Sequence, residues 1–96
     1  MKLEFEWDAS KAAGNLAKHG VAFEEAVSVF ADLLAALFDD PDHSGEESRE
    51  IIVGLSTKPR LLVVSFTERD GRVRLISARP ATAAERRRHE EHTKKR

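Results

Sequence analysis

The sequence predicts an α+β fold, in which a small, mostly antiparallel sheet of about four to five strands packs against two N-terminal helices. Three observations lead to this class: a hairpin pattern over residues 61–79, helical spacing in residues 9–30, and a capped basic segment at the C-terminus. The expected element order is β-α-α-β-β-β-β-α. We expect one small domain over residues 1–96, because a chain of this length has a thin core.

The N-terminal part is predicted to be a strand followed by two helices. Residues 3–7 alternate apolar and polar side chains, which is typical of a half-buried strand. Asp8 suits the N-cap of the first helix, and Gly20 suits its left-handed C-cap. Residues 23–30 then place apolar side chains at helical spacing, which indicates a second helix facing the core.

Two further strands are predicted at residues 33–38 and 50–56, on either side of an acidic stretch at residues 39–47. This stretch contains aspartates and His43, which raises the question of a metal site. It lacks the oxygen-ligand spacing of a calcium loop and an i, i+4 histidine pair. We therefore interpret it as a solvated turn.

Residues 61–79 predict an antiparallel hairpin at the centre of the fold. Asp70-Gly71 separates two runs rich in β-branched and aromatic residues, a strong signal for a tight hairpin turn. The register stays open, because a slip of one residue would reverse the faces of the strand. Pro80 is expected to stop the second strand from continuing inside a sheet.

The C-terminal segment over residues 82–96 predicts a charged helix that begins at Ala83 and runs to about Lys95. Thr82-Ala83-Ala84-Glu85 matches a capping box, in which hydroxyl and carboxylate satisfy the first free amides. The segment has almost no apolar stripe. Such a helix is mobile, partner-bound or laid against a polyanion.

Composition narrows the function classes. The chain has no cysteine, which excludes disulfides and thiolate chemistry. Its net charge is only −1, but the charge is distributed unevenly between the two halves of the sequence. Residues 1–57 hold four Lys/Arg against twelve Asp/Glu, whereas residues 58–96 hold twelve against five. This asymmetry indicates a basic surface for nucleic acid, an acidic surface for a basic partner, or pairing of the two halves.

No apolar run approaches the ~20 residues of a membrane span, and residues 1–8 lack a signal-peptide core, so we expect a cytoplasmic protein without membrane contact.

The residues that carry chemistry are cationic and proton-transferring groups. The sequence has no P-loop, dinucleotide-binding glycine motif, zinc signature or nucleophile elbow. The remaining candidates are Lys11, Lys18, His19, Arg49, Glu68, Arg69, Arg79 and the terminal helix. Metal-free RNA cleavage needs only such groups: a base, an acid and fixed cations at the phosphate. Structural alternatives are that His19 caps a helix C-terminus and that Glu68 and Arg69 flank a turn.

Several blocks resemble one known family in the correct order: FEWDASKAAGNLAKHGVAFEEAVSVF, DPDHS, IIVGLS, LLVVSFTER and ISARPATAAERRRHE. Together they resemble the BrnT-type toxins of type II toxin–antitoxin systems, over Phe5 to about Glu90. The resemblance implies a RelE-like fold and an enzyme that cuts RNA and arrests translation. It also implies neutralisation by a BrnA-like ribbon-helix-helix antitoxin, with which the toxin represses operator DNA.

The polar positions of this pattern fall on a defined set of residues: Lys11, Asn15, Lys18, His19, His43, Arg49, Thr67, Glu68, Arg69, Arg79 and Thr82. Two positions depart from the pattern. Pro80 stands where the resemblance implies a basic residue, and His89 stands where a tyrosine is common. His89 is a plausible replacement, because imidazole exchanges protons near neutral pH.

The leading hypothesis is a metal-independent endoribonuclease toxin without a cofactor. Its predicted catalytic residues are His19, Glu68, Arg69 and Arg79. Its predicted RNA-binding residues are Lys11, Lys18, Arg49, Thr67, Arg86 and Arg87. The alternatives are a non-catalytic antitoxin-binding module that acts as a co-repressor at operator DNA, and an autonomous nucleic-acid-binding domain with steep salt dependence. The partner interface is expected at a strand edge or at the terminal helix.

Overall fold

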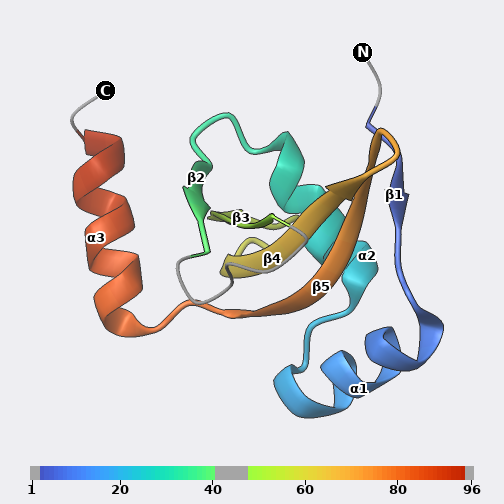
Figure 1. The fold of residues 1–96 in the computed structure, drawn as a ribbon. Helices are drawn as coiled ribbons and strands as arrows, with labels where there is room; N and C mark the ends of the chain where they lie inside the picture. Colours follow the sequence, from blue (N-terminus) through green and yellow to red (C-terminus); the bar gives the residue numbers. More distant parts are fainter. Residues whose placement is uncertain (1–2, 41–47, 95–96) are drawn as a thin grey trace.

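The computed structural model describes residues 3–40 and 48–94, and it contains one five-stranded sheet with helices around it (Figure 1). The elements are, in chain order, β1 (Phe5–Glu6), α1 (Ala9–His19), α2 (Phe23–Val27), the 3₁₀ helix η1 (Ser28–Ala31), β2 (Ala36–Asp39), β3 (Arg49–Leu55), β4 (Leu61–Arg69), β5 (Arg72–Pro80) and α3 (Ala83–Lys94). The α+β class and the predicted order agree with this structure. Residues 41–47, which include His43, lie outside the described residues.

The sheet has the order β1-β5-β4-β3-β2 and is mixed. The pairs β2–β3, β3–β4 and β4–β5 are antiparallel, whereas β1 runs parallel to β5. The prediction of a mostly antiparallel meander is therefore wrong at β1. The physical reason is that β5 leaves one edge open after pairing with β4, and β1 fills it, with the Val73 amide donating to the Glu4 carbonyl at 2.8 Å.

The central hairpin has a two-residue turn with an irregular register. Asp70 and Gly71 both have positive φ angles, 54° and 77°, as the tight hairpin turn requires. A register shift lies between Ser65 and Phe66 of β4, opposite Leu75 and Ser77 of β5. This bulge reverses the alternation in β5, so that Leu75 and Ala78 both reach the core.

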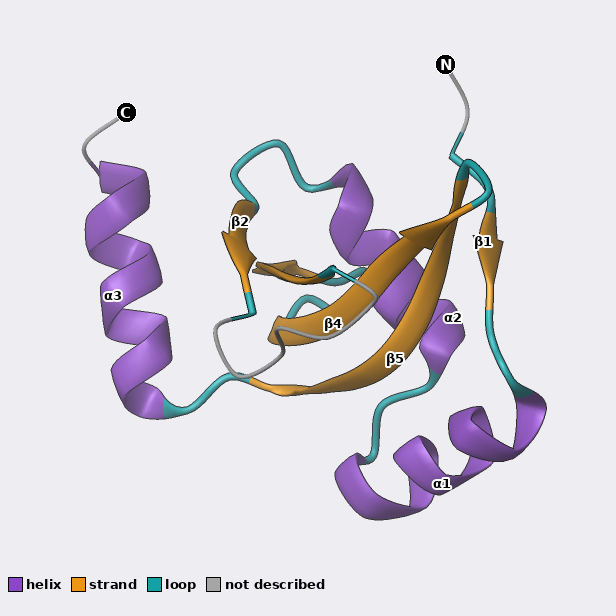
Figure 2. Cartoon of the chain, in the orientation of Figure 1, coloured by secondary structure: helices purple, strands orange, loops and turns teal. Residues whose placement is uncertain are grey.

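One face of the sheet carries the main core and is covered by the N-terminal helical segments (Figure 2). α1 and α2 contact β5, and η1 contacts β3. Phe23, Leu62 and Leu75 are among the fully buried side chains. Phe30 makes edge-to-face contacts with Phe5 and Phe66, at centroid distances of 5.0 and 5.1 Å. We call this the core face.

Two predicted boundaries differ from the structure. The second helix is not continuous, because the Ser28 hydroxyl donates to the Glu25 carbonyl at 2.6 Å and the chain tightens into η1. The predicted strand at residues 33–38 begins only at Ala36. The Asp32 carboxylate accepts from the amide of Leu34 and holds the preceding residues in a turn.

The opposite face of the sheet, the open face, carries a smaller apolar cluster of Val53, Leu61, Val63 and Ala81. α3 stands beside this face and has no buried residue (Figures 1 and 2). Ala81 connects β5 to α3, and its amide donates to the Leu61 carbonyl at 2.9 Å. Within residues 3–40 and 48–94, no helix has both the length and the apolar character needed to cross a membrane.

Candidate active site

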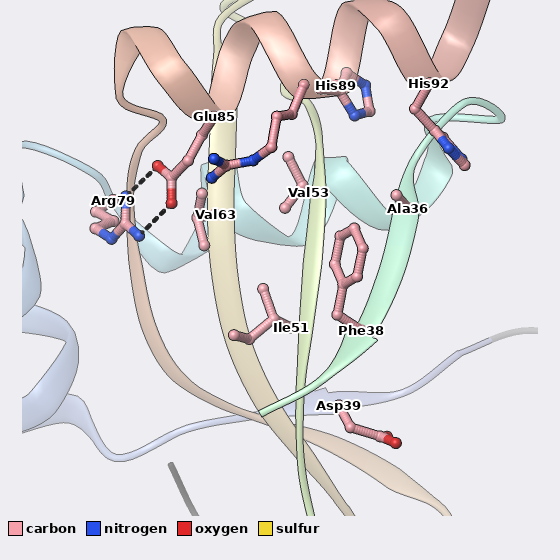
Figure 3. A pocket seen from close by; sticks show the side chains of 11 residues that line it. Ala36, Phe38, Asp39, Ile51, Val53, Val63, Arg79, Glu85, His89 and His92 are labelled. Carbon is pink, nitrogen blue, oxygen red and sulfur yellow. Dashed lines mark hydrogen bonds and ion pairs between the residues drawn. The ribbon is translucent and has the colours of Figure 1, made fainter. Parts of the chain in front are cut away.

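A groove of about 520 Å³ lies between α3 and the open face of the sheet (Figure 3). Its floor is apolar and comes from β2, β3 and β4: Ala36, Phe38, Ile51, Val53 and Val63. Its polar side chains are Asp39, Arg79, Glu85, Arg88, His89 and His92. The groove therefore combines an apolar floor with a charged rim.

Strand register explains why Arg79 belongs to this groove. Arg79 pairs with Val63, Val63 with Val53, and Val53 with Ala36, so these four residues form one row across the sheet. Side chains in such a row point to the same face. Arg79 therefore lies on the open face, at the end of an apolar row.

Asn15 on the core face fixes the strand at this point. Its side-chain oxygen accepts from the Ala78 amide at 3.0 Å, and its side-chain nitrogen donates to the Ala78 carbonyl at 2.9 Å. The same nitrogen also donates to the Val21 carbonyl at 2.9 Å. Asn15 is buried, so it belongs to the scaffold and not to the solvent-exposed polar stripe of α1. Its hydrogen bonds hold the residue immediately before Arg79.

Glu85 holds Arg79 in a bidentate ion pair. Nη1 and Nη2 of Arg79 donate to Oε1 and Oε2 of Glu85 at 2.8 and 2.9 Å. Glu85 also completes the predicted capping box, because its carboxylate accepts from the Thr82 amide and its amide donates to Thr82 Oγ1. The hydrogen bonds from Arg79, followed by those from Thr82, lower the pKa of Glu85 to about 2. Glu85 is therefore a fixed anion at neutral pH.

This pairing leaves one edge of the Arg79 guanidinium available. Nη1 uses its hydrogens on Glu85 and on the Pro80 carbonyl, the latter at 3.3 Å. Nη2 uses one hydrogen on Glu85. Among the residues that the structure describes, none accepts from Nε or from the second Nη2 hydrogen. These two parallel N–H groups match the bidentate geometry that binds phosphate.

α3 contributes a stripe of ionisable side chains to the same groove. Glu85, Arg88, His89 and His92 are spaced at i, i+3, i+4 and i+7, so they lie on one side of the helix. Figure 3 shows His89 and His92 on the side of α3 that faces the strands. Imidazole groups accept and donate protons near neutral pH, and a second arginine adds positive charge to the rim.

The structure does not bring the four predicted catalytic residues together. Arg69 pairs with Arg72 beside the hairpin turn, whereas Arg79 lies near the other end of the nine-residue β5. A strand of this length spans roughly 25 Å. Glu68 is exposed next to Arg69. A single centre that contains both Arg69 and Arg79 is therefore incompatible with the hairpin geometry.

His19 is also separated from the groove. It is the last residue of α1, immediately before the left-handed C-cap Gly20, and α1 packs on the core face. Lys11 and Lys18 are exposed on the same helix. These three residues belong to the helix on the core face, whereas the Arg79 side chain lies on the open face.

The other predicted RNA-binding residues occupy different places. Thr67 is buried, and its hydroxyl donates to the Ser48 carbonyl at 2.7 Å, which gives it a structural role. Arg49 pairs with Thr67 across β3 and β4 and is half-buried. Arg86 and Arg87 are exposed on α3, and Arg86 lines a second hollow of about 380 Å³ beside Leu34 and Leu55.

The basic and acidic parts of the chain partly neutralise each other in the fold. Glu6 of β1 pairs with Arg72 and Arg74 of β5, at 3.7 and 3.0 Å. Glu25 of α2 pairs with Arg60, which precedes β4. The alternative in which the two halves pair is therefore correct for these residues, whereas Arg79 pairs within the basic half.

Metal ligation has no support from the residues that the structure describes. Over residues 3–40 and 48–94, no group of three or more His, Asp or Glu side chains is placed to hold an ion. The acidic stretch that raised this question lies largely outside the described ranges.

Sequence reasoning missed Arg88 and His92 as groove residues. A signal was present, because the capping box fixes where α3 begins and the spacing from Glu85 then places both on one side of the helix. The sequence could not predict that this side of α3 faces the sheet, because the orientation of α3 depends on the path of the chain through Ala81.

Comparison with known proteins gives the family. A family model described as "Ribonuclease toxin, BrnT, of type II toxin-antitoxin system" matches residues 7–85, a range that includes Arg79 and ends on Glu85. The crystal structure of the Brucella abortus ribonuclease toxin, BrnT, has a similar fold, with a TM-score of 0.65 and 24% sequence identity over 84% of this chain and 99% of that chain. A search of curated proteins finds no match. The family match over most of the length places this chain in the BrnT family of ribonuclease toxins of type II toxin–antitoxin systems.

Proposed function

We propose that this chain is a metal-independent endoribonuclease whose active site is the groove between α3 and the open face of the sheet. RNA cleavage would arrest translation, and a BrnA-like ribbon-helix-helix antitoxin would neutralise the toxin and carry it to operator DNA. The family match supports the ribonuclease class. The observation that carries the site is Arg79, which Glu85 holds by one edge while its other edge remains available beside Arg88, His89 and His92.

Arg79 and Arg88 have the chemistry needed for phosphate binding. A guanidinium binds phosphate through two parallel charge-assisted hydrogen bonds, and the Nε and Nη2 groups of Arg79 offer such a pair. The Glu85 carboxylate restricts the rotation of Arg79, so the available edge is oriented before substrate arrives. Fixed donors of this kind stabilise the charge that develops on the phosphoryl oxygens in the transition state.

His89 and His92 have the chemistry needed for proton transfer. One imidazole takes the proton of the ribose 2′-hydroxyl as O2′ attacks phosphorus, and the other, protonated, donates to O5′ as the P–O5′ bond breaks. The products are a 2′,3′-cyclic phosphate and a free 5′-hydroxyl. The low folded pKa of Glu85 excludes it as the proton donor at neutral pH.

This assignment changes the roles of the residues proposed from sequence. Arg79 keeps its role at the phosphate, and His89 takes the position at which the family resemblance implies a tyrosine. Glu68 and Arg69 are not assigned to the reacting centre, because the length of β5 separates them from Arg79. His19 is not assigned to it either, because it belongs to α1 on the core face and does not line the groove. Lys11, Lys18, Arg49, Arg86 and Arg87 remain proposed contacts for the RNA backbone away from the cleavage point, and Arg69 changes from a catalytic residue to a contact of this kind.

The test uses purified, antitoxin-free protein with a defined RNA in the presence of EDTA, beside a cell-free translation reaction whose RNA ends are mapped. We expect inhibition of translation together with new ends that carry 2′,3′-cyclic phosphate, at a rate that EDTA does not change. The His92→Ala variant should cut more slowly, whereas His19→Ala, a histidine change on the other face, should cut like the wild type.

Two outcomes would contradict the proposal. Intact RNA with unaffected translation would favour the non-catalytic antitoxin-binding module. If His19→Ala lost cleavage while His92→Ala and His89→Ala retained it, the chain would still be a nuclease. Its active site would then lie on the α1 side of the sheet and not in the groove.

A further inference from the structure

Exposed apolar side chains gather at the β2 edge of the sheet. Leu33 is 93% exposed, Leu37 62% and Phe38 54%. The β2-edge patch consists of Leu33, Leu34, Leu37, Phe38 and Leu55, and it includes both faces of the sheet edge, because the consecutive strand residues Leu37 and Phe38 point to opposite faces. Leu34 and Leu55 line the same hollow, and the Leu55 amide donates to Asp32 at 2.7 Å, which brings the end of β3 to this patch. So much exposed apolar surface at one place is typical of a protein–protein interface.

The backbone of β2 is also available for pairing. β2 is the last strand in the sheet order, so within the described residues its outer edge has no neighbouring strand. The Asp40 amide donates to the Arg49 carbonyl, and antiparallel bonding alternates, so Phe38 and Ala36 also bond to β3. The amide and carbonyl groups of Leu37 and Asp39 therefore point to the outer edge, where another strand can bind them.

The opposite edge of the sheet has a different character. β1 has only two residues, and its Glu6 side chain is already in ion pairs with Arg72 and Arg74. The β2 edge therefore combines an apolar patch with backbone groups that bond to no other strand within residues 3–40 and 48–94, and β-strand addition requires this combination.

The charged side chains near the β2-edge patch indicate which charge the partner segment carries. Ala36 and Phe38 of β2 share the groove with Arg88, His89 and His92 of α3, while the nearby Glu85 charge is engaged by Arg79. Figure 3 shows Ala36 at the α3 end of β2 and Asp39 at the other end. A partner strand on β2 therefore extends at its Ala36 end toward the part of the groove that α3 lines with Arg88, and acidic residues at that end of the partner complement this arginine.

We propose that the β2 edge is the docking site of the antitoxin, and that the occupant is an extended antitoxin segment with apolar side chains on both of its faces and an acidic end. Its backbone pairs with Leu37 and Asp39, its apolar side chains cover the β2-edge patch, and its acidic end lies at the Ala36 end of β2, toward the groove that Arg88 lines. This inference rests on the proposed function, because it names the partner surface of the same groove. A segment seated there also narrows the groove beside Phe38, so docking and inhibition occur together.

The test measures binding of the full-length cognate antitoxin to the wild-type chain, to Leu37→Glu and to Leu16→Glu. Leu16 is a matched control, since it is 52% exposed and lies on α1, away from β2. We expect Leu37→Glu to raise the Kd by roughly tenfold or more, because strand addition would bury an unpaired carboxylate, and Leu16→Glu to leave it unchanged. RNA cleavage by all three free proteins should be equal.

A backbone measurement tests strand addition directly. Antitoxin binding should slow hydrogen exchange at the amides of Leu37 and Asp39 in the wild-type chain. Equal Kd values for all three proteins, or unchanged exchange at both amides in the complex, would overturn the proposal. So would a wild-type dimer that Leu37→Glu disperses while antitoxin binding stays intact, because the patch would then be a contact between two copies. Absence of RNA cleavage by the free wild-type chain would overturn the proposed nuclease, while the binding data would still decide the docking site.

Discussion

Two arginine–glutamate pairs in this protein have the same chemistry and different surroundings. Arg60 binds Glu25 through Nε and Nη2 at 2.8 and 2.6 Å, and Arg79 binds Glu85 through Nη1 and Nη2 at 2.8 and 2.9 Å. In both pairs the arginine hydrogen bonds are the main cause that lowers the carboxyl pKa to about 2. The Glu25 side chain is only 4% exposed, whereas that of Glu85 is 23% exposed and lies in the groove.

The difference lies in what else each pair contacts. Arg60 Nη2 also donates to the Gly20 carbonyl, and Glu25 also accepts from Ser56, so this pair joins the end of α1, α2 and the turn before β4. Among the described residues, the Arg79 side chain hydrogen-bonds only to Glu85 and to the Pro80 carbonyl. An ion pair whose donors are used by the scaffold stabilises the fold, whereas one that keeps a free edge in a groove is suited to bind a ligand.

The largest expected contrast is in stability. Arg60→Ala should lower the free energy of unfolding by about 3 kcal/mol, because it leaves the buried Glu25 carboxylate without its main partner. Arg79→Ala should lower it by less than about 1 kcal/mol, because Glu85 is partly solvated. Urea unfolding of both variants gives the values. Equal losses would remove the distinction between a structural pair and a functional one.

Asn15→Ala should have the next largest effect, because it removes hydrogen bonds to both backbone groups of Ala78 and to the Val21 carbonyl. We expect a loss of about 2–3 kcal/mol in the free energy of unfolding, together with slower RNA cleavage by the folded fraction, because Arg79 follows Ala78 directly. Lys18→Ala, an exposed change on the same helix, is the control for the unfolding measurement. If Asn15→Ala unfolds like this control, Asn15 does not hold β5.

Acid should weaken both pairs. Because the folded pKa values of Glu25 and Glu85 are depressed to about 2, their contribution to stability is present above the unfolded pKa and is lost as pH falls toward about 2. The free energy of unfolding should therefore decrease from about pH 4.5 downward, and Glu25→Gln should reduce this dependence. A Glu25→Gln profile that keeps the wild-type slope would show that other carboxylates dominate the acid response.

The smallest expected effect distinguishes two roles of Glu85, which are to cap the N-terminus of α3 and to position the Arg79 side chain. Thr82→Ala removes the hydroxyl that accepts from the Glu85 amide, whereas Glu85→Gln changes the charged partner of Arg79. Both should cost about 1 kcal/mol of helix capping. Only Glu85→Gln should also slow RNA cleavage, by roughly tenfold, since a charged hydrogen bond to Arg79 is replaced by a neutral one. Equal cleavage rates for the two variants would mean that Glu85 only caps α3.

Local chemistry made much of this fold predictable. Asp8 caps α1, Gly20 ends it, Asp70-Gly71 forms the turn, and Thr82 with Glu85 forms the capping box, because each feature depends on residues close in sequence. Contacts between distant segments were not predictable. The parallel pairing of β1 with β5 and the burial of Asn15 under Ala78 depend on how the sheet and α1 come together.

The candidate site shows the same division. Arg79 was predicted from the hairpin pattern and the family resemblance, and it lines the groove. The sequence grouped Arg79 with His19, Glu68 and Arg69, whereas the structure places Glu68 and Arg69 near the hairpin turn and His19 at the end of α1. The sequence does not give the length of strand between these residues or the face of the sheet on which each one lies. Arg88 and His92 enter the groove only because Ala81 turns the chain so that α3 stands over the open face.

The most direct test of the account compares RNA cleavage by Arg79→Ala and Arg74→Ala. Both arginines lie on β5 and pair with a glutamate, and their side chains are 39% and 30% exposed, but Arg74 does not line the groove. We predict that Arg79→Ala lowers the single-turnover cleavage rate by roughly 100- to 1,000-fold, as expected for loss of a donor that stabilises the transition state, and that Arg74→Ala cuts within about threefold of the wild type. Equal rates for the two variants would contradict a phosphate site at Arg79.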